Sequence, residues 1–278
     1  LGSLAESGFQ VVFSTHSPLM LSRENAPDTV IVGKNLEAGV TTQKPLRQAV
    51  QEALIEAKSQ SRALFELGNL AEIYFADRVV LCEGKTDSRL LPLAYERLYQ
   101  QSPVSEHTAF VSIGSCADIP KALPVLTAMG IKACAVADLD FAFTHARGGK
   151  SPLLDKNGND LSQVKAVLSG LQQQYGFTLG GNGLPTTDKK SGWMASDVWA
   201  VLATDQEGCK AVNQAHSMLK EKGVWIWPMG CIEQATGCDD KGENAIVQQE
   251  ERMRKMRAEE LEYQMPDFKS CFDWIRSL

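Results

Sequence analysis

The fold is decided by the stretch VVLCEGKTD at residues 79–87, in which an apolar run ends in an acid, a glycine and a second acid. A related stretch, AVADLD, follows at residues 135–140. Short apolar runs predict buried strands, and acids at strand ends offer the hard oxygen ligands that divalent metals prefer. The sequence therefore predicts a metal site of the kind used in phosphodiester chemistry. Its proposed ligands are four carboxylates, those of Glu83, Asp87, Asp138 and Asp140.

Each of these acids also has a simpler interpretation when it is taken alone. Asp87 could offset a helix dipole, Glu83 could be a solvated loop acid, and the Asp-Leu-Asp run could be a turn. Four acids on matching strand ends, with Gly84 beside the first of them, favour the metal site.

The composition indicates a globular protein rather than a disordered or fibrous one. The chain has 278 residues, of which 44% are hydrophobic, and this is enough for one large or two ordinary domains. The formal net charge is -6, from 34 acidic and 28 basic residues, so any DNA contact must use local basic patches. Seven cysteines without a C-x-x-C pair predict reduced thiols, and no signal peptide or membrane-length apolar run is seen. We therefore expect a soluble, cytoplasmic protein with no membrane partner.

Short apolar strands alternate with helices after residue 77. This order predicts an α/β fold with a parallel sheet, because parallel neighbours need crossover connections. The expected strands are 78–82, 108–113, 132–137 and 223–227. The expected helices are 86–100, 118–129, 161–175, more than one helix from about 195 to 221, a charged helix at about 243–264, and 267–277.

The first part of the chain has a different pattern. Strands are expected at 9–13 and 29–32, with 40–42 completing a hairpin, and amphipathic helices are expected from 45 to 75. The chain begins at Leu1 without an initiator methionine, which suggests a piece of a longer protein. We predict five segments. They are a C-terminal remnant of another domain (1–45), a helical connector (46–76), the first part of the α/β domain (77–146), a helical insertion (147–222), and the last strand with the C-terminal helices (223–278).

The acidic motifs resemble those of the Toprim domain, the catalytic module of topoisomerases, primases and a set of nucleases. Glu83-Gly84 resembles the family's glutamate motif, Gly114 its glycine after the second strand, and Asp138-Leu139-Asp140 its D-x-D. The resemblance implies a Toprim fold, a Rossmann-like parallel sheet with a helical insertion. It also implies that the aspartates hold Mg²⁺ and that Glu83 binds metal or acts as general acid or base.

The flanking sequence narrows the resemblance. STHSP at residues 14–18 resembles the switch-histidine loop of ABC-type ATPase heads, in which His16 would sense nucleotide, although an isolated histidine is more often a turn residue. An ABC-type head ahead of a Toprim domain resembles the OLD (overcoming lysogenization defect) family, which includes the nuclease of the Gabija anti-phage system. That resemblance implies an ATPase-nuclease in phage defence or DNA processing, a homo-oligomer and a superfamily 1 helicase partner. Since the chain lacks a Walker A motif, ATP would bind only to the full-length protein.

Two later segments bear on the same family. The run WIWPMGCIE at residues 225–233 resembles its last Toprim strand and G-x-[IL]-E element, which makes Glu233 a candidate metal ligand. Lys241 resembles a downstream catalytic lysine, or is a loop lysine beside two aspartates. Asp197 lies where many members complete the second metal site, but Trp199 occupies the place of an expected glutamate, and Asp197 could simply cap its helix.

A P-loop-like run, RGGKS at residues 147–151, lacks the leading strand and first glycine and is not expected to bind phosphate. It is expected in a flexible basic loop. The insertion supplies the best local positive region for DNA, with a solvated charge run as the equal alternative. The basic residues that form this positive region are Arg147, Lys150, Lys156, Lys189 and Lys190. Of these, Lys150, Lys189 and Lys190 are the proposed DNA contacts.

The sequence thus predicts a DNA endonuclease or nickase that uses two Mg²⁺ or Mn²⁺ ions. Its catalytic residues would be Glu83, Asp138 and Lys241, and its metal ligands Glu83, Asp87, Asp138, Asp140, Asp197 and Glu233. The alternative is a catalytically degenerate Toprim module that binds nucleic acid or regulates a partner. Primase-like nucleotidyl transfer would use the same carboxylates, whereas no tyrosine lies in a motif that suggests a topoisomerase.

Overall fold

The core of the protein is a parallel sheet of four strands. The computed structural model describes residues 2–35, 39–68, 70–149, 152–238 and 242–278. The strands are β3 (Arg78–Cys82), β4 (Thr108–Ser112), β5 (Lys132–Ala137) and β6 (Val224–Ile226). They lie in the order β4-β3-β5-β6, and every neighbouring pair is parallel. The predicted α/β fold with a Rossmann-like parallel sheet is therefore confirmed.

Both faces of this sheet are covered, which explains why the central residues of its strands are apolar. Val79 and Leu81 of β3 belong to one hydrophobic cluster, whereas Val80 and Cys82 belong to the other. The four alternate because successive side chains of a strand point to opposite faces. β5 and β6 divide in the same way, so each face needs a layer of helices to cover it.

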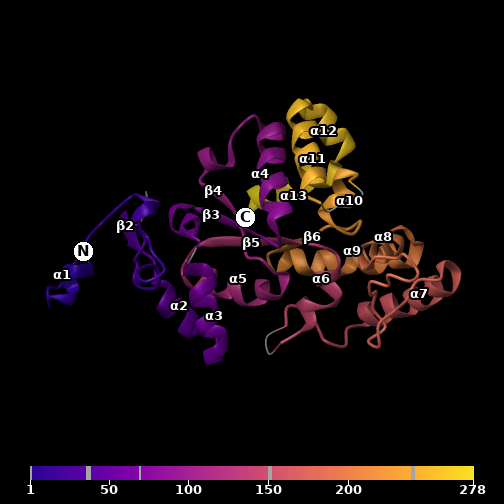
Figure 1. Ribbon diagram of the computed structural model, residues 1–278, viewed down its shortest axis with the longest axis horizontal. Helices are drawn as coiled ribbons and strands as arrows, with labels where there is room; N and C mark the ends of the chain where they lie inside the picture. The colour runs from indigo at the N-terminus through magenta and orange to yellow at the C-terminus, as the bar shows by residue number, and fades with distance from the viewer. Residues whose placement is uncertain (1, 36–38, 69, 150–151, 239–241) are drawn as a thin grey trace.

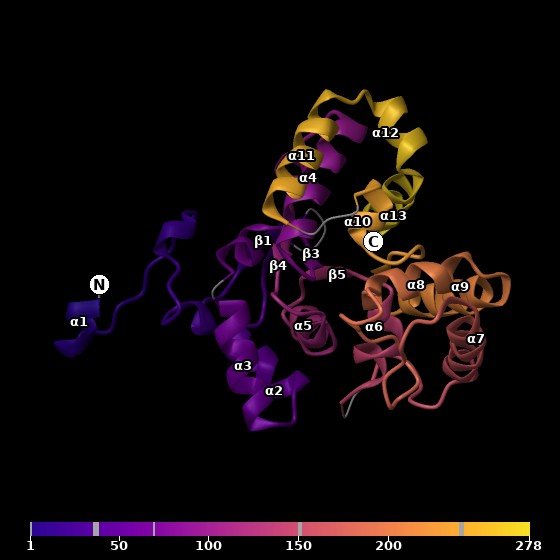
Figure 2. The same cartoon turned by 45° about the vertical axis from the view of Figure 1, so that its right-hand side comes forward.

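Helices far apart in the sequence combine to form these two layers. In Figure 1, one group lies above the sheet and the other below it, and Figure 2 gives the same arrangement after rotation. The first group is α4 (Lys85–Tyr99), α11 (Glu243–Lys255), α12 (Ala258–Gln264) and α13 (Pro266–Ser277). The second group is α2 (Leu46–Ala53), α3 (Ala57–Gly68) and α5 (Ile119–Ala128). The expected helix at 243–264 is two helices, because Met256 and Arg257 have extended backbone between them.

The insertion between β5 and β6 is helical, as predicted. It follows the short helix α6 (Asp140–Phe143) and contains α7 (Asn159–Tyr175), α8 (Ala195–Thr204) and α9 (Gln206–Glu221). Phe143 and Trp199 stack at 5.5 Å, which joins the insertion to the end of β5. After β6, the short helix α10 (Ile232–Thr236) leads to the C-terminal group.

The expectation of a flexible basic loop at Arg147 is wrong. Arg147 is buried, and its guanidinium pairs with the buried carboxylate of Asp160 and donates to the carbonyl oxygens of Ala142 and Asp155. A buried charge needs such partners, and here they fix the start of the loop instead of leaving a cation for DNA.

The first part of the chain is only partly as predicted. β1 (Val32–Asn35) and β2 (Gly39–Thr42) form the expected antiparallel hairpin, with the first strand three residues later than predicted. The strand expected at 9–13 does not form, and the only regular element before residue 18 in the described chain is α1 (Gly2–Glu6). No neighbouring strand is available among the described residues to accept the backbone hydrogen bonds of 9–13. Within the part of the chain that the structure describes, no helix is long and apolar enough to cross a bilayer.

Candidate metal centre

The ends of β3 and β5 bring two acidic motifs together. β3 ends at Cys82 and β5 at Ala137, and the register places these ends side by side. Glu83 and Asp138 are the next residues on the two strands. The backbone N–H of Asp138 donates to Oε2 of Glu83 at 3.4 Å, so the two motifs are in direct contact. The predicted convergence of the β3 and β5 carboxylates is thus present in the structure.

Asp87 is the most buried acid of this group. It lies in the first turn of α4 and is only 5% exposed. Its Oδ1 is buried and has no hydrogen-bond partner among the described residues. Burial, followed by the charges of Glu83 and Glu233, raises the pKa of Asp87 to about 7. A buried carboxylate between two other acids is stabilised as an anion by a bound cation, so Asp87 fits a metal site.

The G-x-[IL]-E element at residues 230–233 reaches this edge through a turn that depends on Gly230. The carbonyl oxygen of Gly230 accepts a hydrogen bond from the N–H of Leu139 at 2.6 Å, which joins the β6 loop to the D-x-D segment. Gly230 has φ of 135°, and a Cβ added there would lie 1.8 Å from Oε1 of Gln234. Only glycine is accommodated at this position. The turn places Cys231 and Glu233 beside Asp138.

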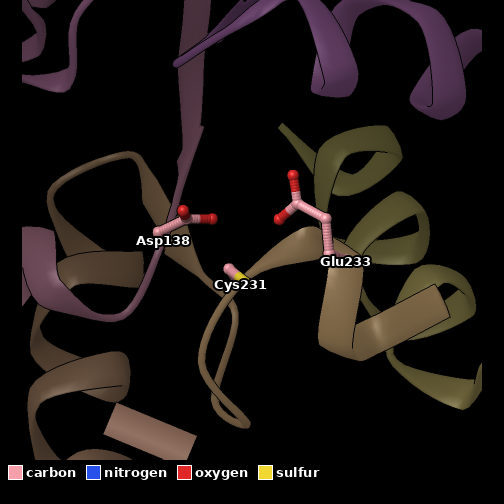
Figure 3. A group of neighbouring side chains, drawn as sticks. All are labelled: Asp138, Cys231 and Glu233. Carbon is pink, nitrogen blue, oxygen red and sulfur yellow. The ribbon is translucent and has the colours of Figure 1, made fainter. Parts of the chain in front are cut away.

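Asp138, Cys231 and Glu233 form a compact group of potential metal ligands. One ligand atom from each lies within 4.8 Å of those of the other two. Figure 3 shows the carboxylates of Asp138 and Glu233 directed into the same space, with Cys231 beside it. Glu233 lies in the first turn of α10 and is buried. Because oxygen and sulfur donors converge from two separate strand ends, this group can hold a divalent metal ion.

Two cysteines at this edge were not singled out from the sequence. Cys231 lies between Gly230 and Glu233 within the G-x-[IL]-E element, and that neighbourhood was the signal that could have found it. Cys116 is buried, and burial together with the charge of Glu83 raises the pKa of its thiol well above the ordinary value. The interpretation of the cysteines as small apolar residues therefore missed Cys231 as a potential ligand and Cys116 as a neighbour of Glu83.

A pocket lies between the acidic edge and the insertion. It encloses about 670 Å³ of empty space, part of it open to solvent. Glu83, Asp138 and Asp140 line one side, and Ser196 and Trp199 line the other. The stacking of Trp199 on Phe143 fixes this second wall. The acids thus face a space large enough to admit part of a substrate.

Comparison with known proteins agrees with this geometry. Residues 74–140 match the family described as "Overcoming lysogenization defect protein-like, TOPRIM domain". They are an OLD-family Toprim region. The matched segment holds β3, β4 and β5 with Glu83, Asp87, Asp138 and Asp140, so it includes the residues on which the prediction rested.

A similar phage protein matches more of the chain than this Toprim region. The chain is 27% identical over 243 residues to the Old nuclease of Escherichia phage P2, covering 87% of this chain and 40% of that protein. The chain therefore spans about two fifths of the length of this relative. A solved structure, the C-terminal region of the Xanthomonas campestris pv. campestris OLD protein, aligns with a TM-score of 0.35 at 12% identity, covering 74% of this chain and 95% of that one.

Some predicted residues do not join the Toprim acids. Asp197 is exposed, and its Oδ2 accepts a hydrogen bond from the N–H of Met194 at 3.1 Å, so it caps α8. This is the simpler role weighed for it, and its role as a metal ligand stays a prediction. His16 is exposed in the N-terminal segment. Lys189 and Lys190 are exposed between Thr187 and Met194, which line the pocket. Lys150 and Lys241 lie outside the described residues.

Proposed function

We propose that this chain is the catalytic part of a metal-dependent DNA endonuclease or nickase. The observation that carries the proposal is the convergence of acids at one edge of the sheet. Glu83, Asp138 and Asp140 line the pocket, Glu233 lies beside Asp138, and Asp87 is buried next to Glu83 and Glu233. The similarity to a phage protein named as a nuclease supports the same reaction class. Hydrolysis of a phosphodiester bond needs stabilisation of negative charge on both the attacking and the leaving oxygen.

Five carboxylates at this edge are the proposed metal ligands. They are Glu83, Asp87, Asp138, Asp140 and Glu233, with Asp197 as a further candidate. Two Mg²⁺ or Mn²⁺ ions, when bound, would supply Lewis acidity to the phosphate and to the attacking water.

Glu83 would also orient the D-x-D segment, because its Oε2 accepts the N–H of Asp138. The other oxygen of its carboxylate could accept a proton from water, which is the general-base role implied by the Toprim resemblance.

DNA would approach from the side of the insertion. Lys189 and Lys190 are exposed next to the pocket wall, where their ammonium groups can contact phosphates. Lys150 is proposed for the same role. Lys241 is proposed to stabilise negative charge that develops on the phosphate.

In the full-length protein, we propose that this nuclease region is joined to an ABC-type ATPase head. The segment 1–45 would be the end of that head, with His16 sensing the nucleotide. The proposed setting is a cytoplasmic homo-oligomer in phage defence or DNA processing, with a superfamily 1 helicase as a partner. These proposals rest on the family resemblance alone.

A second candidate function is a degenerate Toprim module that binds DNA or regulates a partner without cleaving. Two observations favour it. Trp199 occupies the place of an expected acid and is held by its stack on Phe143, and Asp197 is used as a helix cap. Both features leave the second metal position with fewer carboxylates than the family resemblance implies.

A plasmid-nicking assay with Mg²⁺ and Mn²⁺ distinguishes the two functions. Asp138→Asn keeps the shape of the side chain but removes its charge. We expect at least about 100-fold slower nicking, because losing a ligand should cost no less than losing its outer-shell partners. Glu207→Gln is the matched control, since Glu207 is an exposed acid of α9 paired with Lys210. Nicking retained by both Asp138→Asn and Glu83→Ala would overturn the nuclease proposal, and an inactive wild type would favour the binding module.

A further inference from the structure

The sulfur of Cys231 lies close enough to the carboxylates of Asp138 and Glu233 for the three to share one metal ion. Among the described residues, Asp138, Cys231 and Glu233 are a group of three in which all ligand atoms lie within 4.8 Å of one another. Oxygen ligands alone suit Mg²⁺, whereas thiolate favours softer ions such as Zn²⁺. A thiol at this position therefore changes which ion the site would select.

We propose that Cys231 is a thiolate ligand and that it gives the Asp138–Cys231–Glu233 position a preference for Zn²⁺-class ions over Mg²⁺. The ion would bind two carboxylate oxygens and one sulfur, and water or a phosphate oxygen would complete its coordination. The thiol proton is released to solvent when the metal binds. The proposal rests on the metal-dependent function proposed above and specifies the ion at one of its two positions.

The surroundings of Glu233 supply an independent observation. Asp87 is only 5% exposed, and its Oδ1 has no hydrogen-bond partner among the described residues. The charge of Glu233 is one of the causes of the raised pKa of Asp87, so the two carboxyl groups are neighbours. A buried carboxylate oxygen without a partner beside this group is an atom that a bound cation would satisfy.

Cys231 also has a structural role that must be separated from ligation. It is the N-cap of α10, and its sulfur accepts the N–H of Gln234 while the Gln234 side chain accepts the N–H of Cys231 at 2.9 Å. A serine hydroxyl would cap the same helix at least as well. Cys231→Ser therefore preserves the cap and replaces a soft donor with a hard one.

Cys116 is the competing thiol at this edge. Its hydrogen bond and strongest charge interaction are with Glu83, and it does not belong to the compact group around Asp138. Cys209 provides a distant control, because it lies on α9 and accepts a hydrogen bond from Asn213. Serine variants of the three cysteines thus separate ligation by Cys231, ligation by Cys116 and general effects of losing a thiol.

The test uses Co²⁺, a spectroscopic substitute for Zn²⁺, with the 278-residue chain. The wild type should show both Co²⁺ d–d bands and a sulfur-to-cobalt charge-transfer band in the near ultraviolet. Cys231→Ser should keep d–d bands and lose the charge-transfer band, while Cys116→Ser and Cys209→Ser keep both. Calorimetric titration should give Zn²⁺ binding to Cys231→Ser that is weaker by about 10-fold or more, with Mg²⁺ binding changed by less than about threefold.

Other results would overturn the proposal. A charge-transfer band that survives in Cys231→Ser, or that disappears in Cys116→Ser instead, assigns the sulfur elsewhere. A wild type that nicks DNA with Mg²⁺ but gives no charge-transfer band refutes the thiolate ligand and leaves the nuclease proposal in place. Conversely, a band lost only in Cys231→Ser, in a protein that never cleaves DNA, supports the ligand and refutes the nuclease.

Discussion

The N-terminal segment and the central sheet use apolar residues in opposite ways. The run FQVVF at residues 9–13 forms no strand, and Val12 is 89% exposed. The run VVLC at residues 79–82 forms most of β3, and Leu81 is 0% exposed. The difference lies in the neighbours, because β3 has a hydrogen-bonded strand on each side and helices over both faces. An apolar run forms a strand only where neighbouring strands pair with its backbone and helices cover its side chains. Only then can it hold an acid at its end in a fixed position.

The largest difference in stability is expected when the same charged residue is placed in both runs. Leu81→Asp should destabilise the protein by more than about 4 kcal/mol, because it buries an unpaired carboxylate. Val12→Asp should change the free energy of unfolding by no more than about 0.5 kcal/mol, because its side chain meets water. Urea unfolding followed by circular dichroism measures both. A large loss for Val12→Asp would mean that residues 9–13 are packed against the domain in solution.

A pH series compares Asp87 with an exposed acid. Because the folded state raises the pKa of Asp87 from 3.8 to about 7, its contribution to stability is fully present below about pH 4 and is lost as the pH rises through 7. Metal-free wild type should therefore lose on the order of 4 kcal/mol relative to Asp87→Asn between about pH 4 and pH 8. Glu24→Gln, at an exposed N-terminal site, should follow the wild type.

The same pH series also tests the metal site, because Mn²⁺ should offset the loss in wild type at about pH 8 and have a smaller effect on Asp87→Asn. In the presence of chelator, the free energy of unfolding of wild type and of Asp87→Asn could instead change with pH in parallel. That result would contradict the conclusion that burial destabilises the anionic form of Asp87.

Alanine substitution at two glycines with positive φ should give a smaller difference in stability. Gly230→Ala should cost about 3 kcal/mol, because the new Cβ would collide with Gln234 in addition to the backbone strain. Gly8 also has positive φ, of 86°, but a Cβ added there would meet no atom within 4 Å, so Gly8→Ala should cost about 1 kcal/mol. Thermal unfolding compares the two, and equal losses would show that the contact with Gln234 relaxes freely.

The smallest effect is expected for DNA affinity. Lys189→Ala and Lys190→Ala should each reduce the slope of log affinity against log salt concentration by about 1, because each removes one phosphate contact. Lys34→Ala, in the exposed N-terminal hairpin, should leave the slope unchanged. Fluorescence anisotropy with a labelled duplex at several salt concentrations measures this slope. The DNA path proposed here is wrong if only the hairpin variant lowers it.

The sequence predicted those features that depend on local pattern. The alternation of strands and helices predicted the sheet, and the rule that parallel strands present their carboxyl ends at one edge brought Glu83 and Asp138 together. Features that depend on distant partners were missed. Arg147 was interpreted as a surface cation because Asp160, thirteen residues later, gave no sign of being its buried partner.

For the site as well, the sequence predicted the acids at strand ends but not the ligand that depends on a distant turn. The acids after β3 and β5 follow directly from strand ends, whereas Cys231 becomes a candidate ligand only after Gly230 turns the chain toward Asp138. The strand expected at 9–13 failed for the converse reason, since its pattern was suitable but no neighbouring strand lies beside it in the described chain.

The proposed function depends on the binding of divalent metal at the acidic edge of the sheet. Titration with Mn²⁺, followed by the electron paramagnetic resonance signal of the free ion, tests it without requiring cleavage. We expect two Mn²⁺ ions per chain for the wild type and a clear loss of bound ion in Asp138→Asn and Asp87→Asn, with Glu207→Gln binding like the wild type. Equal Mn²⁺ binding by the wild type and both aspartate variants, or no binding by any of them, would contradict it.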